Sequence, residues 1–104
     1  MAQQIVVGVD GGGSKTHVIV ATPRGKVLAE VTGDSSAVAP GEALSSAEVI
    51  GALVRDALAQ AEITERPAAV VAGVAGTGRE KEQKALLRAL RNESLAEDVK
   101  VVPD

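Results

Sequence analysis

The pattern of apolar and polar positions predicts that the chain opens with three short strands. An apolar run ends at Asp10, a β-branched run covers residues 17–22, and a third apolar run covers residues 26–31. Turn-forming glycine and proline residues separate the runs, as is typical of strands joined by tight turns. Residues 33–41, "GDSSAVAPG", are small, polar and closed by Pro-Gly, which indicates a loop.

From residue 42 the apolar period changes to that of a helix. Apolar residues recur at spacings of three and four over residues 42–61, where they occupy positions Leu44, Ala47, Ile50, Val54, Ala57, Leu58 and Ala61. Ser45 with Glu48 is one candidate capping box, and a start nearer Pro40 fits equally well. Glycine weakens a helix interior, so Gly51 indicates close packing of this helix on a sheet.

The second half of the chain predicts a strand, a helix and a final short strand. The stretch "AAVVAGVAG" is a continuous apolar run, which is typical of a strand buried on both faces. Thr77 with Glu80 predicts a capping box that opens a second helix. Three leucines form the inner face of that helix and a charged set forms its solvated face: Leu86, Leu87 and Leu90 inside, and Arg79, Lys81, Glu82, Lys84, Arg88 and Arg91 outside. Residues 99–102 form the last strand.

This order of elements predicts an α/β fold with one mixed five-stranded sheet. Right-handed crossovers make the first, fourth and fifth strands parallel, in the order 3-2-1-4-5, with strand two antiparallel and helices on the sheet faces. Ligands of such sheets lie at the carboxyl ends of the parallel strands. Asp10, Gly76-Thr77-Gly78 and Asp104 follow those ends, so we expect them at one edge of the sheet.

The glycine-rich stretch "GVDGGGSKT" suggests a phosphate site of a particular kind. Gly8 and Gly13 have the spacing of a P-loop, but Ser14 separates Gly13 from Lys15, and the next residues form a β-branched run rather than a helix. We therefore expect a hairpin whose backbone N–H groups converge on an anion, with close approach and positive φ at its glycines. A plain tight hairpin without a ligand is the alternative.

Side chains in the same stretch extend this prediction. Ser14 and Thr16 add hydroxyl donors and Lys15 adds a positive charge. Asp10 is placed to hold Mg²⁺ through water. We interpret His17 as a strand-surface histidine, because no second metal-binding residue stands at ligand spacing.

Composition narrows the classes of function. The 104 residues suit one domain, and the net charge of −3 and the absence of aromatic residues argue against nucleic-acid binding. The absence of cysteine excludes disulfides and thiolate metal sites. No apolar run approaches the length of a membrane span and no signal peptide is evident, so we expect no membrane partner and a cytoplasmic location.

Beyond these patterns, "GVDGGGSKT" resembles the first phosphate motif, D-x-G-G-[ST]-K, of the actin, sugar-kinase and heat-shock-chaperone superfamily. Together with "GVAGTGR" and "VVPD", the stretch resembles the BadF/BadG/BcrA/BcrD-type ATPases, a group that includes the N-acetylglucosamine kinases. The resemblance runs through essentially the whole chain in the same order. It implies a ribonuclease-H-like first lobe and an ATP- and Mg²⁺-dependent phosphotransferase acting on a sugar or amino sugar.

The resemblance also implies roles for particular residues. Asp10 would hold Mg²⁺ through water, Asp104 would be the general base on the sugar hydroxyl, and a third set would line the phosphates: Gly12, Gly13, Ser14, Lys15 and Thr16. Ser36, Gly76 and Thr77 would lie on the substrate side.

Two departures from that family leave the function open. Ala37 stands where the sugar kinases typically carry Asn, which puts N-acetylglucosamine as substrate in doubt. The second lobe, with the other phosphate loop and the adenosine pocket, is not in residues 1–104. The alternatives are therefore an ATPase activator of the 2-hydroxyacyl-CoA dehydratase type and a non-catalytic module with the same fold. We expect residues 1–104 to be an N-terminal lobe that does not turn over ATP alone, unless a homodimer completes the cleft.

Overall fold

The computed structural model describes residues 4–103. Within that range the chain forms five strands and two helices in the predicted order: β1 (Val6–Gly11), β2 (Lys15–Ala21), β3 (Val27–Asp34), α1 (Ala43–Gln60), β4 (Ala69–Val74), α2 (Glu80–Asn92) and β5 (Asp98–Pro103). Strand β3 continues three residues past the predicted end at residue 31, because its pairing with β2 extends to Asp34 opposite Lys15.

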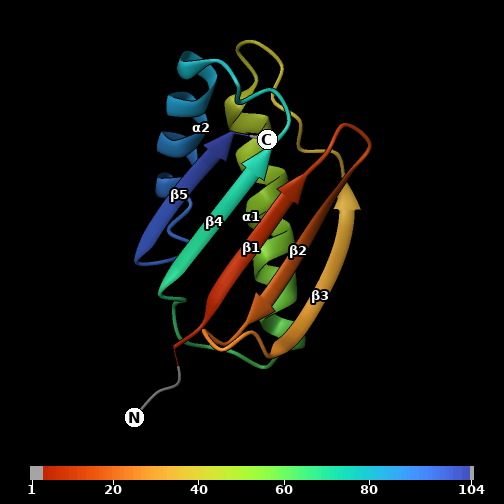
Figure 1. Ribbon diagram of the computed structural model, residues 1–104, viewed down its shortest axis with the longest axis vertical. Helices are drawn as coiled ribbons and strands as arrows, with labels where there is room; N and C mark the ends of the chain where they lie inside the picture. The colour runs from red at the N-terminus through yellow and green to blue at the C-terminus, as the bar shows by residue number, and fades with distance from the viewer. Residues whose placement is uncertain (1–3, 104) are drawn as a thin grey trace.

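The predicted topology is confirmed. The strands lie in the order β3-β2-β1-β4-β5 (Figure 1). Strand β2 is antiparallel to both of its neighbours, whereas β4 pairs in parallel with β1 and β5. The carboxyl ends of β1, β4 and β5 therefore share one edge of the sheet, where the glycine-rich turn also lies.

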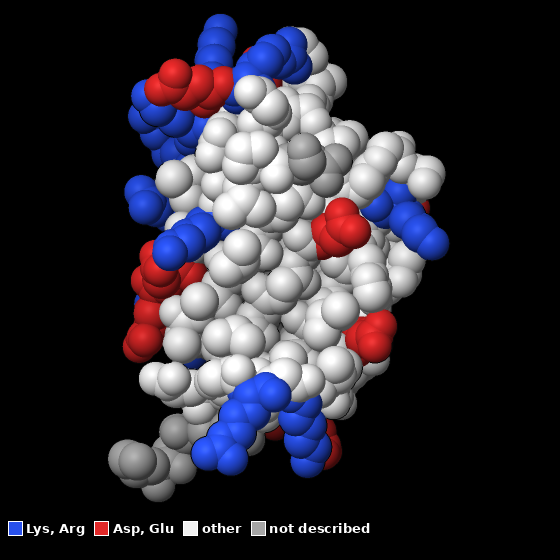
Figure 2. All heavy atoms as spheres, viewed as in Figure 1, with Lys and Arg blue, Asp and Glu red and all other residues white. Residues whose placement is uncertain are grey.

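The helices do not cover both faces of the sheet, which corrects our expectation. Figure 1 shows α1 and α2 behind the sheet, on the same side. On β4, Val70 is fully buried beneath the helices, whereas its neighbour Val71 points to the other face and is 41% exposed. The apolar run of β4 is thus buried on one face only within residues 4–103. Figure 2 shows that few charged side chains interrupt the uncovered face.

Small aliphatic side chains fill the core between the helices and the sheet. Fully buried valines from β1, β2 and β4 face Ile50 of α1 and Leu86 of α2. Since β-branched residues pack well on a pleated surface, a core without aromatic side chains still closes this layer. Leu44, which we assigned to the inner stripe of α1, is 66% exposed, and Glu82, which we assigned to the wet face of α2, is buried.

Neither predicted capping box forms. Helix α1 begins at Ala43, so Ser45 lies inside its first turn and its hydroxyl contacts Glu42. Helix α2 has Arg79 as its N-cap, while the Thr77 hydroxyl donates to the Val74 carbonyl at 2.7 Å and so closes the turn after β4. The turn residue that the sequence pattern assigned to the helix therefore serves the end of a strand.

Gly51 allows a close approach, although not to the sheet as we expected. A Cβ at this position would collide with the Glu93 side chain, which follows α2 and pairs with Arg55 at 2.9 Å. The glycine therefore brings α1 close to the C-terminal end of α2. Neither described helix is long and apolar enough to span a membrane.

Candidate functional site

The glycine-rich stretch forms the predicted hairpin. Strand β1 ends at Gly11 and β2 begins at Lys15, with Asp10 opposite His17 in the antiparallel register. The Gly12 N–H donates to the Lys15 carbonyl at 2.9 Å and closes the turn. No helix starts at Ser14, so the predicted hairpin is confirmed and the P-loop geometry is absent here.

The glycines of the hairpin do not adopt the positive φ that we predicted. None of Gly11, Gly12 and Gly13 has positive φ, so conformational freedom does not explain them. A Cβ at Gly11 would collide with the Ser36 hydroxyl and lie 3.1 Å from Val74, whereas a Cβ at Gly13 would meet nothing within 4 Å. Gly11 therefore permits packing beneath the hairpin, and Gly13 leaves open space above it.

The loop after β3 supports the hairpin from below. The Ser35 hydroxyl donates to the Gly12 carbonyl at 3.1 Å. The Thr16 hydroxyl lies 2.7 Å from both the Asp34 carbonyl and the Ser36 hydroxyl. Thr16 and Ser36 are both buried, so water does not compete for these hydrogen bonds, and they hold the turn against the loop after β3.

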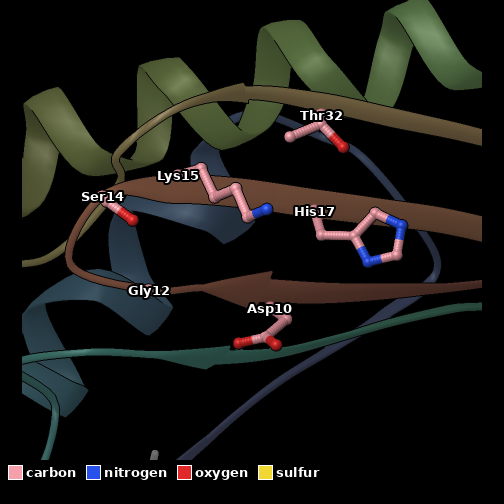
Figure 3. Close-up of a pocket in the computed structure, with 6 residues that line it drawn as sticks. All are labelled: Asp10, Gly12, Ser14, Lys15, His17 and Thr32. Atoms are coloured by element: carbon pink, nitrogen blue, oxygen red, sulfur yellow. The ribbon is translucent and has the colours of Figure 1, made fainter.

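A hollow of about 400 Å³ lies beside the hairpin on the uncovered face. Its lining residues are those shown in Figure 3: Asp10, Gly12, Ser14, Lys15, His17 and Thr32. Within the described residues, no hydrogen bond engages the N–H groups of Gly13 and Ser14, but that of Gly12 is occupied by the turn itself. Ser14 and Lys15 line the hollow and carry groups that can donate hydrogen bonds to an anion, Gly13 lies beside them in the turn, and Asp10 lines the same hollow.

The carboxylate at the hollow fits a magnesium ion that keeps most of its bound water. Residues 4–103 contain no group of three or more His, Cys, Asp or Glu side chains able to enclose a metal. Mg²⁺ commonly binds through one or two carboxylates plus substrate phosphates and retains several waters. Asp10, exposed at the edge of the hollow, is a carboxylate of this kind.

The predicted substrate-side residues lie outside the hollow. Ser36 and Thr77 are buried, and their hydroxyls bond to other parts of the protein. Gly76 has φ of +93° and meets the Val38 carbonyl so closely that no Cβ would fit. This contact joins the loop after β4 to the loop after β3, so Gly76 fixes the edge of the sheet. Asp104 lies outside the described residues, and β5 ends at Pro103 on the same edge.

Sequence reasoning did not place three residues near the site. His17 lies on the strand surface, as expected, but it also lines the hollow, with its ring 2.8 Å from Glu30. Thr32 reaches the hollow because β3 is longer than predicted. Ser35 supports the turn from a loop that sequence period alone cannot position. The strand register was the signal available for His17, since residue 17 must face the same side as Asp10.

Comparison with known proteins places this geometry in a family. The chain matches the BadF/BadG/BcrA/BcrD ATPase family over residues 7–101. It therefore belongs to that family, as its sequence resemblance indicated. No curated protein matches the chain.

Solved structures agree on the fold. The provisionally assigned N-acetylglucosamine kinase of Chromobacterium violaceum is 21% identical, with a TM-score of 0.74, and the match covers 97% of this chain and 35% of that one. The ROK hexokinase of Thermus thermophilus is 23% identical, with a TM-score of 0.75 and coverages of 97% and 34%. A Ppx/GppA family member from Aquifex aeolicus is 17% identical, with a TM-score of 0.56 and coverages of 98% and 36%.

These matches confirm the ribonuclease-H-like fold of the sugar kinases. The chain spans about a third of the length of each of these three proteins.

Proposed function

We propose that this chain is the N-terminal lobe of an ATP-dependent sugar kinase and that its β1–β2 hairpin holds the terminal phosphates of the nucleotide. The observation that carries the proposal is the hollow beside the hairpin, where Asp10, Lys15 and the turn residues meet. The family is one of ATPases, and sugar kinases share the fold, which supports both parts of the proposal.

The hairpin residues take complementary roles in this proposal. The N–H groups of Gly13 and Ser14 and the Ser14 hydroxyl donate to phosphate oxygens, and the absence of side chains at Gly12 and Gly13 lets the phosphates approach the backbone. The Lys15 ammonium neutralises charge as a flexible point charge. Thr16 acts from beneath, because its hydroxyl holds the loop that supports the turn.

Magnesium, held by Asp10 through water, would neutralise charge that develops on the transferring phosphoryl group. Phosphoryl transfer needs mostly positioning and electrostatic stabilisation from the protein, together with a carboxylate that accepts the proton of the attacking hydroxyl. We assign that carboxylate to Asp104, which follows the last strand. Ser36, Gly76 and Thr77 shape the substrate side of the edge by fixing its loops rather than by direct contact.

A second lobe would supply the remaining parts. The hollow is open to solvent, and the chain carries no aromatic residue to stack on adenine. Water-exposed charge contacts are weak, and closure of a second lobe over the hollow would exclude that water. The match to about a third of the length of these two kinases supports this division of the site between lobes.

Comparing the affinities of magnesium ATP, magnesium tripolyphosphate and adenosine tests the assignment of the hairpin to phosphate binding. Because only the phosphates find partners among residues 4–103, magnesium tripolyphosphate should bind this chain about as tightly as magnesium ATP, with dissociation constants of about 1 mM or weaker because the contacts are exposed to water. Adenosine should not bind measurably. Adenosine binding as strongly as ATP, or no binding of tripolyphosphate, would contradict the assignment.

A further inference from the structure

His17 is held in a defined orientation at the wall of the hollow. Its Nε2 atom lies 2.8 Å from the Glu30 carboxylate on β3. On its other side the residue faces Asp10, its register partner on β1. Figure 3 shows the two ring nitrogens on opposite sides of the ring, one toward the strand of Thr32 and one toward the strand of Asp10.

The contact with Glu30 determines what the second ring nitrogen can do. A carboxylate only accepts hydrogen bonds, so Nε2 carries the hydrogen that is donated to Glu30. In a neutral imidazole the other nitrogen is then an acceptor. With the ring neutral, Nδ1 therefore presents a lone pair on the side that faces Asp10.

The pair has little to contribute to the stability of the fold. The side chains of His17 and Glu30 are 38% and 53% exposed, and solvent-exposed ion pairs add little to folding. The contact nevertheless fixes a ring at the wall of a hollow that Asp10 and Lys15 also line. A role toward a ligand accounts for this placement better than a role in folding does.

Two neighbouring acceptors, the Asp10 carboxylate and His17 Nδ1, suit a ligand that offers several divergent donors. A hydrated divalent cation is such a ligand, because each of its bound waters donates outward. The described residues cannot enclose a bare ion, so an ion at this place keeps its water shell. Lys15 has only donors, so it cannot supply a third acceptor to the water shell.

We propose that His17, oriented by Glu30, is a second acceptor beside Asp10 for the water shell of the magnesium ion that accompanies the nucleotide. The nucleotide part rests on the proposed function, whereas the binding of a hydrated cation can be tested without it. His17 acts here as a positioning residue for the ion, and not as an inner-sphere metal ligand.

The tautomer of the ring is the first test. His17 is the only histidine in the chain, so its ring nitrogens give unambiguous ¹⁵N resonances. At a pH where the ring is neutral, we expect the Nε2–H tautomer almost alone in the free protein, and in Glu30→Ala a fall to the weaker Nε2–H preference of an unpartnered imidazole. A free protein with hydrogen on Nδ1 alone would overturn the inference.

Binding of hexaamminecobalt(III) is the second test, because its inert ammine ligands donate outward as bound waters do and cannot be displaced by protein. The affinity is taken from the backbone amide shifts of Asp10 and Gly12. His17→Leu should weaken binding about threefold to tenfold, the value of one hydrogen bond. His17→Asn should retain most of the affinity, since its amide oxygen can replace Nδ1 as the acceptor.

The outcomes separate this inference from the proposed function. Equal binding by the protein and His17→Leu, or no binding at millimolar probe, would overturn the role of His17. Hexaamminecobalt binding that depends on His17, combined with no binding of magnesium tripolyphosphate, would support the cation site and contradict the nucleotide assignment. Unchanged amide spectra away from the hollow would verify that each variant remains folded.

Discussion

The hydroxyls of Thr16 and Ser36, twenty positions apart in the sequence, lie 2.7 Å from each other beneath the β1–β2 hairpin. Thr16 also reaches the Asp34 carbonyl at 2.7 Å. A carbonyl can only accept, so Thr16 gives its hydrogen to Asp34 and accepts the hydrogen of Ser36. This buried chain of hydrogen bonds fixes the loop after β3 against the turn that we assign to phosphate binding.

Removing the Thr16 hydroxyl should destabilise the fold without removing the phosphate site. Thr16→Val keeps the shape but leaves the buried Ser36 hydroxyl without this partner, which costs about 1–3 kcal/mol of unfolding free energy. Chemical denaturation measures this loss. Thr32→Val, at an exposed position, should change the stability by less than about 0.5 kcal/mol. If Thr16 contacts phosphate directly, folded Thr16→Val would instead bind magnesium tripolyphosphate more weakly.

Two glycines of the hairpin should respond to alanine in opposite ways. Gly11→Ala forces a methyl group against Ser36 and Val74, and overpacking of this kind costs about 1–3 kcal/mol. Gly13→Ala meets no neighbouring atom, so its denaturation midpoint should be unchanged or slightly raised. The new methyl group occupies space that we assign to phosphate, so magnesium ATP should bind Gly13→Ala more weakly. Unimpaired binding by folded Gly13→Ala would place the phosphates elsewhere.

Adjacent valines of β4 should report which face of the sheet is covered. Val70→Thr buries a hydroxyl beneath the helices and should cost about 1–3 kcal/mol. Val71→Thr exposes its hydroxyl on the open face and should change the stability by less than about 0.5 kcal/mol. Urea denaturation of the two variants gives the comparison. Similar losses for both would mean that the open face is covered in solution, for example by a second copy of the chain.

The order of elements and the sheet topology could be predicted from sequence because they depend on local periodicity and on the handedness of crossovers. The capping boxes could not, because Thr77 has a nearer acceptor in the Val74 carbonyl and sequence spacing does not reveal it. The prediction that β4 is buried on both faces was wrong within residues 4–103. An apolar run does not show which of its residues meet a helix. The role of Gly11 depends on Ser36, and this contact between distant residues leaves no local pattern.

For the candidate site, too, local sequence pattern predicted some features and contacts between distant residues determined the others. Motif spacing was enough to bring Asp10, Ser14 and Lys15 to one hollow, since they lie on one hairpin. Motif spacing alone did not show that Thr16 points to the interior. Strand alternation does show it, because it places Thr16 on the face opposite Lys15 and His17. The orientation of the His17 ring could not be predicted, because it depends on the contact with Glu30, and that contact follows from the register of β2 and β3.

Residues 1–104 alone should not transfer phosphate. The hollow is open to water and offers no pocket for adenine, so we expect neither ATP hydrolysis nor phosphorylation of glucose or N-acetylglucosamine above background. Both reactions are measured with purified chain and magnesium ATP, and Asp10→Ala serves as the control for a contaminating kinase. Turnover by the unmodified chain that disappears in Asp10→Ala would show that the cleft is completed without a second lobe, most simply by a homodimer.

The central claim is that the β1–β2 hairpin binds nucleotide phosphates, and amide mapping of magnesium ATP binding tests it most directly. In ¹H–¹⁵N spectra of the labelled chain we predict saturable shifts at Gly12, Gly13, Ser14 and Lys15, with an affinity that falls at least about threefold in Lys15→Met. The basic residues of α2 give the internal comparison, since Lys84, Arg88 and Arg91 line a separate surface hollow. Shifts confined to α2, or no shifts at the hairpin at saturating magnesium ATP, would contradict the claim.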